Sequence, residues 1–170
     1  MISQITDSEL AWKPVSYLSR LSEESKKIEG EVVHRARLSV VGFKWPSGSA
    51  SSNSIKECIR VCDNKTGKSR AADAKALKKG ESLVFALPLF VKDFSTLHSN
   101  RTAVVHLIDS NGDGKSGFFP GISVEQLLKS DGARQKALEA LKLLLKFNVH
   151  LEVALSVSSD GYMIIQSDKT

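Results

Sequence analysis

The residues best suited to chemistry lie in a short polar segment that begins at Asp109. Asp109, Asn111 and Asp113 are spaced like the first three oxygen ligands of a calcium-binding loop, and Gly114 allows the sharp turn that such a loop needs. The second half of the pattern is missing, because its last ligand position holds Pro120 in place of glutamate. We therefore interpret the segment as a polar turn and predict no metal site.

Two cysteines and a glycine-containing run are the other candidates. Cys58 and Cys62 are four residues apart, which in an extended strand places them on one face about 13 Å apart, at roughly 3.3 Å per residue. That separation is too long for a disulfide and the spacing is not that of a zinc site, so we predict free thiols. The run Gly112–Ser116 resembles the end of a phosphate-binding loop, but Asp109 stands where that motif needs its first glycine.

No catalytic motif accompanies these residues. HExxH, GxSxG and complete P-loop patterns are absent, and no histidine has a neighbour that marks it as a general base (His34, His98, His106 and His150). The sequence therefore predicts a protein that is not an enzyme, with no catalytic residue, no cofactor and no small-molecule substrate.

Positive charge is concentrated in one short stretch. The chain has 170 residues with 24 basic and 19 acidic side chains, a net charge of +5. Residues 64–79, the basic segment, hold one acidic and six basic groups, so the rest of the chain is nearly neutral: Lys65, Lys68, Arg70, Lys75, Lys78 and Lys79. A solvated loop is one interpretation. The other is a flexible loop that binds phosphates, of lipid headgroups or of nucleic acid. The segment has no aromatic residue, so base stacking within it is not expected.

The N-terminal region differs in pattern from the remainder. Residues 6–29 show helical periodicity, with Pro14 suited to a first turn and Gly30 to a stop. We expect residues 1–30 to form an arm and helix that mediate self-association through apolar residues: Trp12, Tyr17, Leu18 and Leu21.

Residues 31–170 are expected to form one domain. Alternating or apolar runs predict strands at 31–43, 55–62, 82–91, 101–109, 149–157 and 162–166. Flexible loops are expected near 46–54 and 64–80, and Pro88 indicates an edge strand or a bulge.

A helical region precedes the last two strands. Ser123 and Gln126 fit a capping box, and the helix is expected to break at Asp131-Gly132 and to resume over 133–147. The apolar stripe of the second part faces the core in our interpretation, with a membrane surface as the alternative (Ala137, Leu138, Leu141, Leu144 and Leu145). The fold class predicted is α+β, an antiparallel sheet of about six strands packed with two or three helices.

Length and composition set limits. A hydrophobic content of 41% is enough to bury a core. No apolar run approaches the roughly 20 residues of a membrane-spanning helix, and the first residues do not resemble a signal peptide. We therefore expect a chain that is neither secreted nor transmembrane.

Two viral families share the order of these features. The strand at 32–41, the basic segment, the strand 101–109, the helix starting at 133–138 and the closing strand near 162–165 together resemble the matrix proteins of plant-infecting rhabdoviruses. This resemblance implies a structural protein of virion and host cytoplasm that self-associates. It also implies links to the viral nucleocapsid or RNA and to anionic membrane, to which the protein binds peripherally.

A second, weaker resemblance is to the 30K superfamily of plant viral movement proteins. It rests on segments at similar spacing to the strand blocks of that family: Val61-Cys-Asp63, Leu83–Pro88 and Gly117–Glu125. This alternative implies a protein that binds nucleic acid for transport between cells.

Overall fold

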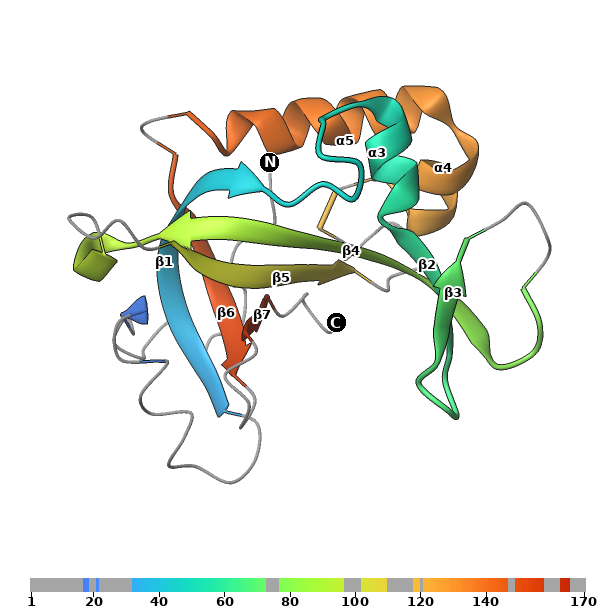
Figure 1. Cartoon of the computed structure of the whole chain (residues 1–170), viewed down its shortest axis with the longest axis horizontal. Coiled ribbons are helices and arrows are strands. Elements are labelled where there is room, and N and C mark those ends of the chain that lie inside the picture. Colours follow the sequence, from blue (N-terminus) through green and yellow to red (C-terminus); the bar gives the residue numbers. More distant parts are fainter. Residues whose placement is uncertain are drawn as a thin grey trace.

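The computed structural model describes most of the chain from Val32 onward and three residues before it (Figure 1). The described residues are 17, 18, 21, 32–72, 77–96, 102–109, 118, 119, 121–146, 149–157 and 163–165. Within them, no helix is both long and apolar enough to cross a membrane.

Five strands pair in a closed ring: β1 (Val32–Phe43), β4 (Glu81–Lys92), β5 (Ala103–Asp109), β6 (Leu151–Val157) and β7 (Met163–Ile165). β1 pairs antiparallel with β4 and with β6, and β4 pairs antiparallel with β5. β7 runs parallel to β5 and antiparallel to β6. Because β1 has β4 on one side and β6 on the other, the sheet closes into a barrel.

The order of the barrel strands defines the fold. Leaving out the strands outside the ring, β1, β4 and β5 follow one another in space, and β6 returns to lie beside β1. This β6-β1-β4-β5 order is that of a Greek key, and β7 fills the gap between β6 and β5. A five-stranded Greek-key barrel is the architecture of the OB fold, which we therefore assign to these strands.

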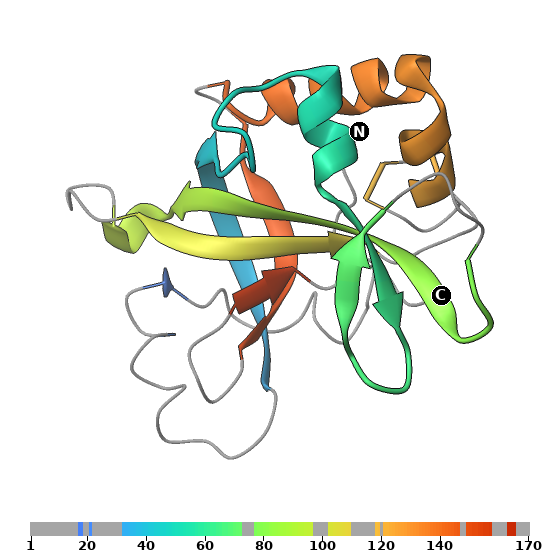
Figure 2. The ribbon, with the colours of Figure 1, turned by 45° about the vertical axis from the view of Figure 1, so that its right-hand side comes forward.

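Residues 44–80, the inserted segment, separate the first two barrel strands. They contain helix α3 (Ser52–Glu57) and the strands β2 (Ile59–Asp63) and β3 (Ser69–Ala71). β2 pairs with the first half of β4 and β3 pairs with β2, so this hairpin extends the sheet beyond the barrel. Figure 2 shows the hairpin projecting from the body of the molecule.

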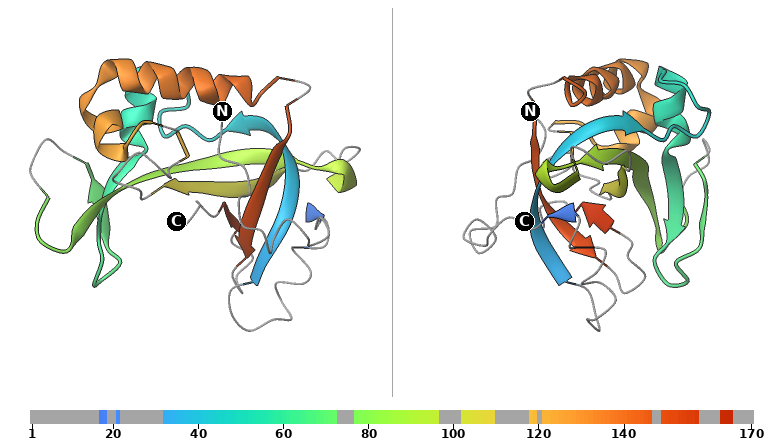
Figure 3. Two further views of the ribbon diagram at one scale, coloured as in Figure 1. Left: turned by 180° about the vertical axis from the view of Figure 1, so that it is seen from behind. Right: turned by 60° about the vertical axis from the view of Figure 1, so that its left-hand side comes forward.

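Helices cover one side of the strands. α4 (Val124–Lys129) and α5 (Asp131–Leu143) lie together with α3 on the same side (Figure 3). A short 3-10 helix, η1 (Phe94–Thr96), follows β4 in the connection to β5, and residues 93–96 are called the tip below. The capping box of Ser123 and Gln126 is present as predicted, and the break between α4 and α5 falls at Ser130, one residue before the position expected.

The barrel interior is apolar because alternate residues of each strand point inward. On β4 and β5 the buried positions alternate with half-buried ones: Phe85, Leu87, Leu89, Val91, Val105 and Leu107. Phe85 meets Phe119 edge to face, with ring centroids 5.5 Å apart. Four residues of the predicted stripe add to the same core, which confirms its core-facing interpretation: Ala137, Leu138, Leu141 and Leu144. The fifth, Leu145, lies after the end of α5 and is exposed, so including it was wrong.

The predicted fold class is confirmed: the described residues of elements β1 to β7 and α3 to α5 form seven strands and three α-helices, with one parallel pairing, β5 with β7. The strand expected over 55–62 is wrong in its first half, which is helix α3. Ser51 caps this helix by accepting the N–H of Ser54, and Ile55 and Cys58 lie buried at helical spacing. In the sequence, Ile55, Glu57, Ile59 and Val61 also occupy alternate positions, as in a strand, which explains the error. The basic segment, expected as a loop, contains β3.

Pro88 lies in a central strand, contrary to the prediction of an edge or bulge. Its carbonyl accepts the N–H of Lys44, so the position of its missing N–H faces the same side of β4. On that side β2 pairs only as far as Phe85, and β1 begins to pair at Leu89. Proline is tolerated because it falls between the two partner strands.

Candidate functional site

The basic segment begins at the β2–β3 turn, which the backbone holds in a tight shape. The Asp63 side chain accepts the N–H groups of Lys65 (2.8 Å) and Thr66 (3.2 Å). Gly67 donates its N–H to the Asp63 carbonyl and adopts a φ of +69°, a conformation that favours glycine. The turn therefore presents Lys65 and Lys68 to solvent from a fixed backbone.

The end of the basic segment is tied to β4 by Glu81. One carboxylate oxygen of Glu81 accepts the backbone N–H of Lys78 (2.9 Å) and lies 3.2 Å from Nη2 of Arg70. These partners, the Lys78 N–H first, lower the pKa of Glu81. Arg70 is thus engaged at the base of the hairpin. Lys75, the sixth predicted basic residue, lies outside the described residues.

Four lysines of the segment, by contrast, point into solvent. Among the residues that the structure describes, none of them forms an ion pair: Lys65, Lys68, Lys78 and Lys79. Positive charges without a carboxylate partner are available to phosphate groups of a ligand.

A second candidate surface is the outer face of β4 and β5. Residues directly opposite each other on paired strands share a face, which here places Phe90 beside Val104 and Pro88 beside His106. These side chains are half-buried. Phe90 also lies opposite Gly42 of β1, where a side-chain carbon added to the glycine would sit 3.4 Å from the phenyl ring. That distance is an ordinary van der Waals contact, so Gly42 and the ring of Phe90 are close neighbours on this face.

His106 gives this face a polar group that is neutral near pH 7. Burial, and to a smaller extent the positive charge of nearby Lys44, lowers the pKa of His106. Further along the same face, Arg60 of β2 lies opposite Val84 of β4 and is exposed. The face thus runs from an apolar centre at Phe90 toward the basic segment.

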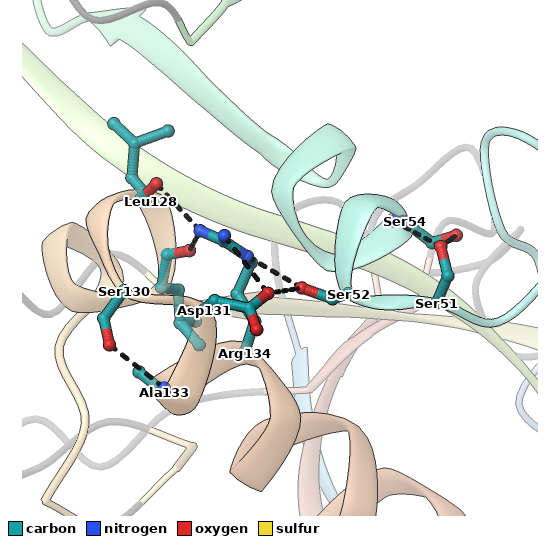
Figure 4. A network of polar contacts seen from close by, with 9 residues as sticks. Ser51, Ser52, Ser54, Leu128, Ser130, Asp131, Ala133 and Arg134 are labelled. Carbon is teal, nitrogen blue, oxygen red and sulfur yellow. Dashed lines mark hydrogen bonds and ion pairs between the residues drawn. The ribbon is translucent and has the colours of Figure 1, made fainter.

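The inserted segment is fastened to the helices by Arg134 (Figure 4). Its guanidinium donates to the carbonyls of Leu127 (3.1 Å) and Leu128 (3.0 Å) at the end of α4, and to the hydroxyl of Ser52 in α3 (3.1 Å). Ser52 also donates to Asp131. One side chain therefore links α3, α4 and α5, and so holds the inserted segment against the helices that cover the strands.

The residues predicted for self-association are divided by the structure. Leu18 and Leu21 are buried in the core of the same chain, whereas Tyr17 is 43% exposed. Trp12 and most of the helix expected over 6–29 lie outside the described residues. Self-association itself stays a prediction.

The residues considered first for chemistry have structural surroundings. Asp109 is buried and accepts the N–H of Phe118 (2.8 Å), so its carboxylate supports the chain after β5. Cys58 ends α3 and Cys62 lies in β2, not together in one strand as expected, and both are free thiols. Burial raises the pKa of Cys58 to about 12, which makes it a poor nucleophile.

The sequence interpretation missed the outer face. Phe90, His106 and Gly42 were not proposed as site residues, although the alternation in 82–91 places Phe90 opposite in direction to the buried Phe85 and Leu87. That alternation was the available signal. The pairing of Gly42 with Phe90 had no signal, because it depends on closure of the barrel.

Comparison with known proteins adds a relationship to a part of two larger proteins. Over 110 residues, 65% of this chain, the sequence is 33% identical to telomere-binding protein subunit alpha of Stylonychia mytilus. It is also 33% identical, over the same length, to telomere-binding protein subunit alpha of Sterkiella nova. The matches cover 22% and 21% of these relatives, so the chain spans about a fifth of their length. No family model matches the chain.

These relatives overturn the viral interpretation. The resemblances to rhabdovirus matrix proteins and to 30K movement proteins were wrong, and with them the predicted roles in virion assembly, membrane attachment and transport between plant cells. Both rested on the order and spacing of strands around a basic segment, which a Greek-key barrel with a basic insertion also produces. The chain is similar instead to a portion of ciliate telomere-binding proteins.

Proposed function

We propose that this chain binds single-stranded DNA, and that telomeric DNA is its target. The observation that carries the proposal is the position of the exposed lysines that form no ion pair within the described part of the chain: they lie in the segment inserted between the first two strands of a five-stranded Greek-key barrel. OB folds bind oligonucleotides with the face of their second and third strands and with the loop between the first and second. Here these parts are the β4–β5 face and the inserted segment.

The two surfaces supply different interactions. Lys65, Lys68 and Lys79 contact phosphates without reading sequence, and the half-buried ring of Phe90 offers an aromatic surface for a base. Stacking on such a ring requires an unpaired base, so the face selects a single strand over a duplex. The target in telomeres is inferred from the names of the two ciliate relatives.

We also propose a binding role without catalysis. Two potential reactive groups are unsuited to chemistry: the carboxylate of Asp109 supports the backbone of Phe118, and burial raises the pKa of Cys58 to about 12.

Fluorescence anisotropy with labelled 16-nucleotide probes tests the proposal. The probes are a telomeric-repeat single strand, a scrambled single strand of equal composition and the telomeric duplex, each titrated from 50 to 200 mM salt. We expect the single strands to bind more tightly than the duplex, the repeat more tightly than the scrambled strand, and affinity to fall with salt by about 0.7 log units per phosphate contact in each tenfold change of salt. Absence of binding at 50 mM salt, or equal binding of duplex and single strands, would overturn single-strand recognition. Equal binding of repeat and scrambled strands would overturn only the telomeric target.

A further inference from the structure

Phe94 is an aromatic side chain that the fold leaves in water. It lies in η1, at the tip between β4 and β5, and is 79% exposed. The next most exposed large hydrophobic side chain among the described residues is Leu143 at 51%, on α5. The ring is not part of the hydrophobic core.

The tip that carries Phe94 has a defined shape. Asp93, only 6% exposed, accepts the backbone N–H of Ser95 (2.9 Å) and its hydroxyl (2.6 Å), and its own N–H donates to Thr96 (3.0 Å). The other carboxylate oxygen accepts the N–H of Leu18 (2.6 Å), so the tip is also fastened to the N-terminal helical turn. The backbone that carries the exposed ring is therefore held by a partly buried hydrogen-bond network.

The nearest neighbours of the ring in sequence are polar or charged. Ser95 and Thr96 follow it, Asp93 and Lys92 precede it, and among the described residues no other exposed large hydrophobic side chain lies in η1. A protein interface requires a contiguous apolar patch, whereas a single aromatic face is what an unpaired base needs for stacking.

The position of Phe94 relative to the basic segment points the same way. β4 begins at Glu81, two residues after Lys79, and ends at Lys92, two residues before Phe94. Its twelve residues span roughly 36 Å at about 3.3 Å per residue. In Figure 1 the β2–β3 hairpin and η1 lie at opposite ends of β4. Between them lies the outer face with Phe90 and His106.

From this arrangement we infer that Phe94 stacks on a base of the bound single strand, at the end of the β4–β5 face far from the basic segment. The inference rests on the proposed function and extends it, because it adds a second aromatic contact outside the barrel face. A strand that meets lysines at one end and Phe94 at the other would cross the whole length of β4.

Substitutions at Phe94 test this contact with the 16-nucleotide single-stranded probe. Phe94→Ala should weaken binding by about tenfold, the size expected for loss of one stacked base, with an unchanged salt slope. Phe94→Tyr should bind like the wild type, and Phe94→Leu, which keeps apolar area but loses the aromatic face, should resemble Phe94→Ala. Leu143→Ala, an exposed apolar residue elsewhere, is the matched control and should change nothing.

A set of probes with one abasic site at successive positions locates the contact. The wild type should lose about tenfold at one position near an end of the probe, and Phe94→Ala should be insensitive at that position alone. Thermal unfolding of Phe94→Ala should match the wild type, because so exposed a ring makes few contacts.

The outcomes separate this inference from the proposed function. If the wild type binds single strands and Phe94→Ala binds within twofold of it, the stacking role is wrong and the proposed function stands. Full binding by Phe94→Leu would likewise overturn stacking. If the wild type binds no single strand, both are wrong. The same probes made as RNA show whether the contact depends on DNA; binding confined to RNA would overturn the assignment to DNA.

Discussion

The barrel and the inserted segment differ in whether their positive charges form ion pairs. On the barrel, Arg35 and Arg37 of β1 both reach Glu152 on the neighbouring strand β6, and Arg35 donates from Nε at 2.7 Å. In the inserted segment, Lys65, Lys68, Lys78 and Lys79 form no ion pair within the described part of the chain. The first charges join two strands, and the second project from a hairpin into solvent.

This difference separates stability from binding. Paired charges and an apolar interior stabilise the barrel whether or not a ligand is present. Exposed lysines that repel one another, and whose ammonium groups form no ion pair within the described residues, add little to the fold, so their concentration in one short segment calls for another explanation. An anionic ligand supplies it. Mutations in the barrel should therefore change unfolding, and mutations of the lysines should change binding.

The largest effect should come from the barrel interior. Phe85 is fully buried and packs edge to face against Phe119, so Phe85→Ala should lower the free energy of unfolding by about 3–5 kcal/mol. Urea denaturation measures the change. Phe94→Ala, the same substitution at an exposed site nine residues away, is the control and should leave unfolding unchanged. Similar losses for the two variants would contradict the division between core and surface.

Removing the contacts of Arg134, which hold the inserted segment against α4 and α5, should have an intermediate effect on stability. Arg134→Ala removes hydrogen bonds to Leu127, Leu128 and Ser52, and should cost about 2 kcal/mol in the free energy of unfolding. Arg134→Lys should not restore the loss, because an ammonium cannot reproduce the planar fork of donors. Hydrogen exchange at α3 should rise in both variants. Unchanged exchange there would show that the inserted segment is held by other contacts.

The smallest effect should be that of the paired charges on the barrel. A hydrogen bond from Arg35 is the main cause of the lowered pKa of Glu152, so this carboxylate stabilises the fold above its ordinary pKa of 4.5 and ceases to do so as pH falls through its lowered value. Glu152→Gln should cost less than about 1 kcal/mol at pH 7. The difference from wild type should shrink as pH falls below 4.5 and vanish once pH is below the lowered pKa of Glu152, as measured by urea denaturation at a series of pH values. A difference that persists in acid would mean that the pair is not responsible.

Local features of the fold could be predicted from the sequence, and its closure could not. Two features depend only on neighbours within a few residues and so are visible in the sequence: the capping box of Ser123 and Gln126, and the alternation of β4. The first half of 55–62 was mistaken for a strand because Ile55, Glu57 and Ile59 lie at alternate positions, although Ile55 and Glu57 belong to helix α3.

The candidate site divides in the same way. Counting charges located the basic segment, since clustering along the sequence needs no fold to be seen. Whether Phe90 and Phe94 are available to a ligand depends on the exposure of their side chains, which residue type does not reveal. Phe85 and Phe94 are the same amino acid nine positions apart, yet one is buried and the other is 79% exposed. The pairing of β1 with β4 that seats Phe90 over Gly42 arises only when the barrel closes.

The central claim is that the basic segment contacts the phosphates of a single strand, and two triple variants of equal charge test it most directly. One replaces Lys65, Lys68 and Lys79 with Gln, and the other replaces three exposed lysines of α5 and the residues after it with Gln: Lys136, Lys142 and Lys146. Anisotropy titrations with the 16-nucleotide single strand from 50 to 200 mM salt give the salt slope of each. We predict that the first variant loses about 2 units of slope, so that the wild type weakens about 20-fold more than this variant over that range, while the second keeps the wild-type slope. Equal slopes for the two variants would show that net charge alone governs binding, and would contradict the account.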